Sequence, residues 1–238
     1  MPRFRSAPAM HLSRRAALKI ASGLGLAAVA PTATPAIGLA APATVSGVML
    51  GRDAWGARPP RPGGRPHTID RMTIHHSAVA LPDNRQIAAR LRQHQRYHQD
   101  DKGWVDIAYH AAVDRRGNIF ALRNPAIAGD TATDYDTTGH FLVLCEGNFD
   151  EEAITEAQLN GAALVCAWAT RQFGITTATL ASHREVTAVT SCPGANLESH
   201  LVSGDLKGRI DNLIVSGFEL TPVSGPQAAT IVAGIEAG

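Results

Sequence analysis

Net charge is nearly absent from this chain of 238 residues, because 22 lysines and arginines are balanced by 21 aspartates and glutamates. Proteins that bind nucleic acid or adhere to anionic membranes present a basic surface, so the charge balance favours neither class. Internal repeats and low-complexity segments are missing after the N-terminal region. The remaining composition, with 45% hydrophobic residues, is ordinary for a globular protein.

A long hydrophobic run is also missing, and the apolar stretch at residues 20–30 is too short to span a membrane stably. Ser-Arg-Arg-Ala-Ala-Leu-Lys at residues 13–19 precedes it and small residues follow, which is typical of a twin-arginine export signal. A membrane anchor and a buried core helix are the alternatives. We expect residues 1–43 to be a signal cleaved after Ala40 or Ala43, and the mature protein to act in the periplasm or outside the cell.

About 195 residues remain after the signal, enough for one α/β domain with a substantial core rather than two domains. We expect this domain to span residues 44–214. Residues 215–238 carry small side chains with weak periodicity, so we expect a C-terminal tail that is poorly ordered or loosely packed.

Hydrophobic periodicity places strands and helices alternately along the domain. Arg115-Arg116-Gly117 marks a hairpin turn, and Thr155 and Gly174 are expected to begin and end a long helix. The expected strands are 71–76, 107–114, 118–122 and 140–148, and the expected helices are 84–98, 155–173 and 196–214, the last interrupted by Gly204 and Gly208. This order predicts a single domain with a central mixed β-sheet flanked by helices.

Cysteine is scarce, with Cys145, Cys166 and Cys192 as the three examples. An odd number in an exported protein leaves at least one cysteine outside an internal disulfide. Cys145 and Cys166 lie in apolar runs, where cysteine behaves as a small hydrophobic residue, and this favours two buried thiols over a pair. Assigning Cys192 to a metal would resolve the odd number.

Three side chains are potential zinc ligands: His75, His183 and Cys192. His75 and His76 end the expected strand 71–76, and because adjacent strand side chains point to opposite faces, one of the two can face a site. His183 and Cys192 lie nine positions apart on a segment that turns back at Pro193-Gly194. Three nitrogen and sulfur donors would leave zinc a fourth position for water, as in hydrolytic sites.

Other interpretations of these residues stay open at this point. Cys192 could be a free buried thiol, or a nucleophile activated by His183, although that pair would leave His75 unexplained. His94 and His98 also have a ligand-like spacing on the expected helix. No glutamate follows His94 as a zincin motif requires, and polar neighbours indicate a solvated face, although His98 could instead pack beside the following loop.

Five segments in order along the chain carry a resemblance to a known family. They are Arg-Asp-Ala-Trp-Gly-Ala-Arg-Pro-Pro at 52–60, Ile-His-His-Ser-Ala at 74–78, Gly-Trp-Val-Asp-Ile-Ala-Tyr-His at 103–110, Gly-Asn-Phe at 147–149, and 183–194 from His-Arg-Glu-Val to Thr-Ser-Cys-Pro-Gly. Together they resemble the zinc-dependent N-acetylmuramoyl-L-alanine amidases and the peptidoglycan recognition proteins that share their fold. The resemblance covers roughly residues 51–214.

This resemblance implies that His75, His183 and Cys192 bind Zn2+. It implies that Tyr109 is catalytic and that Thr190 lies near the substrate carbonyl. The implied reaction is hydrolysis of the amide between N-acetylmuramic acid and L-alanine, with peptidoglycan or a muropeptide as substrate. Recognition proteins that only bind typically lack the cysteine ligand, so the resemblance favours an enzyme.

Departures from the family concern the groove around the site. The interval from His183 to Cys192 is one residue longer than the commonest form, and Gly129-Asp130-Thr131 replaces a common Gly-x-His motif. Residues 137–140 replace the usual glycine-rich entry to a strand. We therefore expect an altered substrate groove, while Glu146 could be a site carboxylate or an edge residue.

Three further residues of these motifs have two possible roles each. Trp55 and Trp104 are expected to pack in the core rather than to stack on sugars. Asp106 could orient a ligand histidine or cap a turn.

Overall fold

The computed structural model describes residues 44–238, and the expected export signal lies outside the described residues. Seven strands form one sheet in the order β6-β2-β5-β3-β4-β1-β7, in which only β3 and β4 pair antiparallel. The strands are β1 Val45–Leu50, β2 Arg71–His76, β3 Ala111–Val113, β4 Ile119–Ala121, β5 His140–Cys145, β6 Leu180–Ser182 and β7 Phe218–Val223. The helices are α1 Ile87–Arg96, α2 Glu156–Phe173, α3 His183–Val186, α4 Ala195–Val202, α5 Asp205–Ser216 and α6 Gly225–Ala237.

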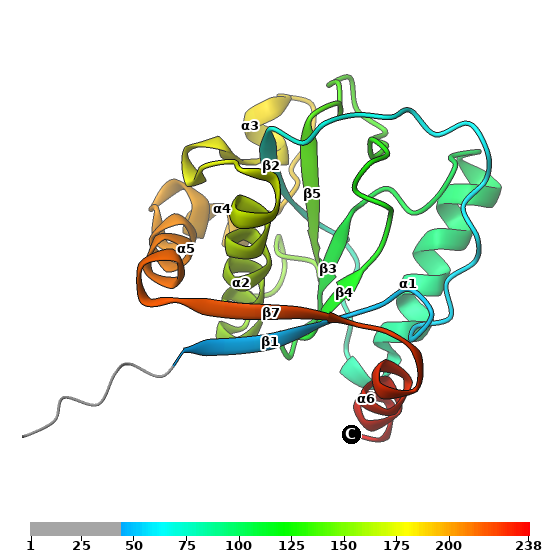
Figure 1. Cartoon of the computed structure of the whole chain (residues 1–238). Coiled ribbons are helices and arrows are strands. Elements are labelled where there is room, and N and C mark those ends of the chain that lie inside the picture. Colours follow the sequence, from blue (N-terminus) through cyan, green and yellow to red (C-terminus); the bar gives the residue numbers. More distant parts are fainter. Residues whose placement is uncertain (1–43) are drawn as a thin grey trace, which may run out of the picture. The chain divides into compact units, whose positions relative to one another are not determined.

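Helices cover both faces of this sheet, as the alternation of elements predicts (Figure 1). The α2, α4 and α5 helices lie on one face, and α1 and α6 lie on the other. Successive side chains of a strand point to opposite faces, so Val143 of β5 packs with α2 whereas Leu144 packs with α1. The two faces therefore have separate hydrophobic cores.

The strand that carries the histidine pair lies inside the sheet. β2 pairs in parallel with β5 on one side and with β6 on the other. All six residues of β5 are buried, in keeping with the near-continuous apolar runs of parallel strands covered on both faces. The carboxyl ends of β2 and β6 consequently lie side by side.

The expected helices form where capping residues predict their ends. Thr155 accepts a hydrogen bond from the Gln158 backbone N–H at the start of α2, and Gly174 ends that helix in the left-handed conformation. α1 begins at Ile87 and continues after Arg96 as one wider π-helical turn. The interruption expected at Gly204 separates α4 from α5, whereas Gly208 lies inside α5.

The expectation of a loosely packed tail after residue 214 is wrong. α5 continues to Ser216, β7 pairs with β1 along all six of its residues, and α6 follows. Phe218 and Leu220 alternate with exposed residues in β7, and Ala228 and Val232 of α6 are buried at helical spacing. A strand and a helix in this segment complete the domain, and its small residues gave too weak a periodicity to predict them.

Among residues 44–238, no helix has the length and apolar character needed to cross a membrane.

Candidate metal centre

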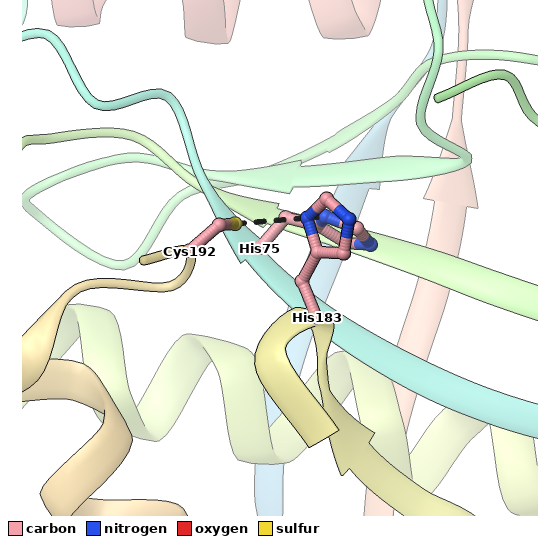
Figure 2. Close-up of side chains that lie close together, drawn as sticks. All are labelled: His75, His183 and Cys192. Carbon is pink, nitrogen blue, oxygen red and sulfur yellow. Dashed lines mark hydrogen bonds between the residues drawn. The ribbon is translucent and has the colours of Figure 1, made fainter. Parts of the chain in front are cut away.

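The three residues expected to bind zinc converge. One ligand atom from each of His75, His183 and Cys192 lies within 4.8 Å of the others, and all three side chains are buried. Cys192 Sγ lies 3.7 Å from His75 Nδ1, and the two imidazole centroids are 4.6 Å apart (Figure 2). His75 thus meets His183 and Cys192, which lie more than a hundred positions later in the sequence, in a single cluster.

Strand pairing explains why the two histidines meet. Ile74 of β2 lies opposite Ser182 of β6, so the residues that follow them, His75 within β2 and His183 at the start of α3, lie next to each other at the carboxyl end of β6. Ser182 also caps α3, since its hydroxyl accepts from the Glu185 N–H at 3.2 Å and the Glu185 carboxylate accepts from the Ser182 N–H at 2.6 Å. This capping box fixes the backbone at His183.

The second histidine of the pair serves the packing instead. His76 Nδ1 accepts a hydrogen bond from the Phe149 N–H at 3.3 Å, and the two rings stack. The backbone N–H of His76 donates to Cys192 Sγ at 3.4 Å. Gly194 lets the cysteine loop approach this layer, because a Cβ there would lie 2.5 Å from the Phe149 carbonyl carbon and its φ is +86°.

Two hydroxyl groups that the sequence did not reveal hold the outer edges of the imidazoles. Thr133 Oγ1 lies 2.9 Å from His183 Nε2, and the Tyr135 hydroxyl lies 3.4 Å from His75 Nε2. Metal-binding histidines commonly use one ring nitrogen as ligand and donate a hydrogen bond from the other. The contacts at Nε2 therefore suit rings that offer Nδ1 to a metal.

Burial keeps the two candidate histidine ligands in the neutral form that can bind a cation. Burial lowers the pKa of His183 to about 4 and that of His75 well below its ordinary value. Both rings are therefore neutral at neutral pH, and each has a ring nitrogen with a free electron pair for a metal. Burial raises the pKa of the Cys192 thiol to about 12, against a hydrogen bond from His76 that lowers it. A bound cation would reverse that shift, and two imidazoles with one thiolate are a common ligand set for zinc.

Tyr109 and Thr190, the two residues to which the resemblance gives a part in catalysis, line the same cavity of about 330 Å³ as the three candidate ligands. The centroid of the Tyr109 ring is 5.2 Å from that of His75, and burial, followed by the nearby Cys192, raises the pKa of the Tyr109 hydroxyl. Thr190 Oγ1 accepts from the Cys192 backbone N–H at 3.1 Å, which leaves its own O–H free to donate. Both hydroxyls can therefore serve as neutral hydrogen-bond donors.

Other residues considered in the sequence do not join the cluster. His94 and His98 are not among the three candidate ligands, and His98 packs against the following loop, where it is buried and accepts from the Ala108 N–H at 3.1 Å through Nδ1. Asp106 orients no ligand histidine, because its carboxylate binds Arg52 at 2.9 Å. Trp55 is fully buried, as expected.

The remaining expectations concern Trp104, Glu146 and the other cysteines. Trp104 is partly exposed and lines the cavity. Glu146 is fully buried, which decides against an edge residue. Cys145 and Cys166 are free buried thiols, as expected.

Comparisons with known proteins show the family of the chain. A family described as N-acetylmuramoyl-L-alanine amidase matches residues 65–195. Human N-acetylmuramoyl-L-alanine amidase is 36% identical over 115 residues, which make up 45% of this chain but only 19% of the human protein. Drosophila melanogaster peptidoglycan-recognition protein LB is 30% identical over 166 residues, covering 65% of this chain and 68% of that protein.

Solved structures confirm the expected fold. Wild-type Drosophila PGRP-LB matches with a TM-score of 0.59 at 26% identity, over 67% of this chain and 94% of that chain. A PGRP-LB mutant in complex with tracheal cytotoxin matches with a TM-score of 0.58 at 26% identity, over 65% of this chain and 93% of that chain. The chain therefore belongs to the N-acetylmuramoyl-L-alanine amidase family, which includes both amidases and peptidoglycan-recognition proteins.

Proposed function

We propose that this protein is a zinc-dependent amidase that hydrolyses the bond between N-acetylmuramic acid and L-alanine in peptidoglycan or muropeptides. The observation that carries the proposal is the convergence of His75, His183 and Cys192 beside Tyr109 and Thr190 in one cavity. Members that only bind peptidoglycan typically lose the cysteine, and this chain retains it.

Zinc held by the three side chains would supply a water of lowered pKa and would polarise the scissile carbonyl. The chain contributes hydrogen-bond donors around that carbonyl. Tyr109 stays protonated because burial raises its pKa, so its hydroxyl can donate to negative charge that develops on the carbonyl oxygen. Thr190, fixed by the Cys192 N–H, provides a second neutral donor.

A thiol hydrolase that uses Cys192 and His183 fits the geometry less well. The groups within hydrogen-bond distance of Cys192 Sγ in the described part of the chain are His75 Nδ1 and the backbone of His76. His183 Nε2 is instead bonded to Thr133. The nucleophile and base of that mechanism are therefore not paired.

Mass spectrometry of muropeptides digested by the purified protein tests the proposal directly. We expect release of free stem peptides, loss of that release with a chelator, and recovery when zinc is added. Cleavage that persists in metal-free protein would favour the thiol mechanism. Binding of muropeptides with no cleavage by zinc-loaded protein would place the chain among the recognition proteins.

Substrate chemistry and the sequence together suggest where this activity operates. Peptidoglycan lies outside the cytoplasm, and residues 1–43 have the pattern of a twin-arginine export signal. We therefore propose that the protein acts in the periplasm or the cell wall after export.

A further inference from the structure

A cavity of about 530 Å³ adjoins the candidate metal centre, and one of its walls has no regular secondary structure. Five of its fourteen lining residues lie in the segment 131–136, which we call the wall segment. Thr131 and Thr133 also line the metal cavity, so the wall segment borders both cavities. Whatever holds the wall segment in place therefore shapes the space beside the metal centre.

Backbone hydrogen bonds do not hold the wall segment. None of its six residues belongs to a helix or a strand. Within residues 44–238, its backbone N–H and C=O groups make no hydrogen bond to another backbone group. Segments with so few backbone hydrogen bonds open locally at a small free-energy cost. The position of the wall segment consequently depends on its side chains.

Two of these side chains contact the candidate ligands. Thr133 Oγ1 lies 2.9 Å from His183 Nε2, and the Tyr135 hydroxyl lies 3.4 Å from His75 Nε2. The Tyr135 ring packs against His183 and His140, with centroid distances of 5.1 and 5.2 Å. Both imidazoles of the candidate metal centre are therefore in direct contact with the wall segment.

The wall segment has two other side-chain contacts with the rest of the described chain. Thr187, on the loop that leads to Cys192, donates a hydrogen bond from its hydroxyl to Asp134 at 2.5 Å. Asp136 pairs with Arg65 at 3.0 Å, but both side chains are more than half exposed, so this ion pair contributes little. The remaining hydrogen bonds of the wall segment join residues two positions apart. Its main anchors are thus the two candidate histidine ligands and the cysteine loop.

Metal binding would fix the direction of both histidine contacts. A neutral imidazole without a metal can carry its proton on either ring nitrogen. An imidazole that binds a metal through Nδ1 carries the proton on Nε2 and donates a hydrogen bond from there to an outer partner. Resting on the zinc binding of the proposed function, we propose that metal binding by His75 and His183 fastens the wall segment through Thr133 and Tyr135.

This proposal couples metal binding to the cavity of about 530 Å³. When the wall segment is fastened, the cavity has its complete lining, whereas in metal-free protein five of the lining residues lie on a segment that opens locally. Such coupling is reciprocal. A ligand that rests against the wall segment should therefore bind the zinc-loaded protein more tightly than the metal-free protein.

Hydrogen exchange of the backbone amides, read by mass spectrometry, tests the proposal with zinc as the only added ligand. Each residue of the wall segment has an N–H to report, since none is a proline. We expect zinc to slow exchange of the wall segment about tenfold in the full-length protein, a change that one or two hydrogen bonds produce. Peptides from α6 should exchange equally in both states, because α6 lines neither this cavity nor the metal cavity.

The double variant Thr133→Val, Tyr135→Phe removes both hydroxyls with little change in volume. At zinc concentrations that saturate it, as metal analysis verifies, exchange of the wall segment should no longer respond to zinc. Thr133→Ser keeps the hydroxyl and should keep the response. Thr138→Val is the matched control, because its hydroxyl contacts Asp136 and neither histidine, and it should also keep the tenfold response. A merely structural role of the two hydroxyls would change exchange equally with and without zinc.

Equal exchange of the wild-type wall segment with and without bound zinc would overturn the proposal, and so would a tenfold response that survives in the double variant. The wild-type comparison decides the matter even if the double variant does not fold. Zinc that protects the wall segment in a protein that cleaves no muropeptide would support the coupling and refute the amidase. Zinc-dependent cleavage without that protection would do the reverse, and a protein that binds no zinc would refute both.

Discussion

At the scale of single residues, a substitution of Tyr109 can distinguish the loss of catalysis from the loss of zinc. Tyr109→Phe keeps the ring beside His75 and removes only the hydroxyl donor. We expect normal zinc content and a kcat reduced about a hundredfold or more, the usual cost of losing a donor to a developing oxyanion. Metal analysis and muropeptide turnover measure the two effects. Cys192→Ala should lose both zinc and turnover, and a fully active Cys192→Ala enzyme would contradict the metal centre.

Thr133 provides a second test at this scale, because its hydroxyl contacts the candidate ligand His183. Thr133→Val removes the 2.9 Å contact to His183 with little change in volume. Loss of such an outer partner typically weakens metal affinity by about 10- to 100-fold. Competition with a zinc chelator measures this. Thr138→Val, an exposed threonine of the same segment, is the control, and equal zinc affinity in both variants would contradict the positioning role.

The cluster of His75, His183 and Cys192 could be predicted from the sequence, while its surroundings could not. His75, His183 and Cys192 carry their chemistry in the residue type and stand in recognisable motifs. Thr133, Tyr135 and Glu146 acquire their roles from partners 50 to 60 positions away, such as the pairing of Glu146 with His94. Local spacing contains no signal for such contacts.

At the scale of elements, the strands and helices that local sequence marks could be predicted, and those that depend on distant partners could not. β2, β5 and α2 could be predicted because a dense apolar pattern or a capping residue marks them within a few positions. β1 and β7 could not, since each depends on a partner at the opposite end of the described chain. α6 lacks a charged polar face, so its helical periodicity was weak.

The C-terminal helix should contribute to stability, because it covers the core behind α1. Val232 of α6 is buried, whereas Thr230 of the same helix is exposed. Val232→Asp places an unpaired carboxylate in the apolar core and should lower the free energy of unfolding by about 3 kcal/mol or more. Thr230→Asp adds the same charge at the surface and should change it little. Denaturant unfolding compares them, and equal stabilities would show that α6 does not support the core.

At the scale of the whole molecule, buried neutral histidines should make the fold sensitive to acid. Nδ1 of His98 accepts from the Ala108 N–H, and Nδ1 of His110 accepts from the Leu142 N–H, so protonation would break both bonds. Burial lowers the pKa of each histidine from 6.5 to about 3. Their stabilising contribution is complete above pH 6.5 and is lost as the pH falls toward 3.

We therefore expect the Tm to fall between pH 7 and pH 4, and His110→Gln to reduce that fall. Glutamine can keep a donor for the Ile127 carbonyl and an acceptor for the Leu142 N–H but does not titrate. Calorimetric scans across this pH range measure the slope. A slope unchanged by His110→Gln would assign the acid sensitivity to other groups.

The proposed export would connect the proposed zinc site to the whole chain, because the twin-arginine pathway carries folded proteins. A chain that folds before export can bind zinc and bury Cys192 before it meets an oxidising compartment. Replacing Arg14 and Arg15 by lysines should therefore retain the precursor in the cytoplasm. That precursor should already contain zinc, as metal analysis of the purified protein would show. Undiminished export of the lysine variant would exclude this route, and a folded precursor without zinc would mean that the metal is acquired only after export.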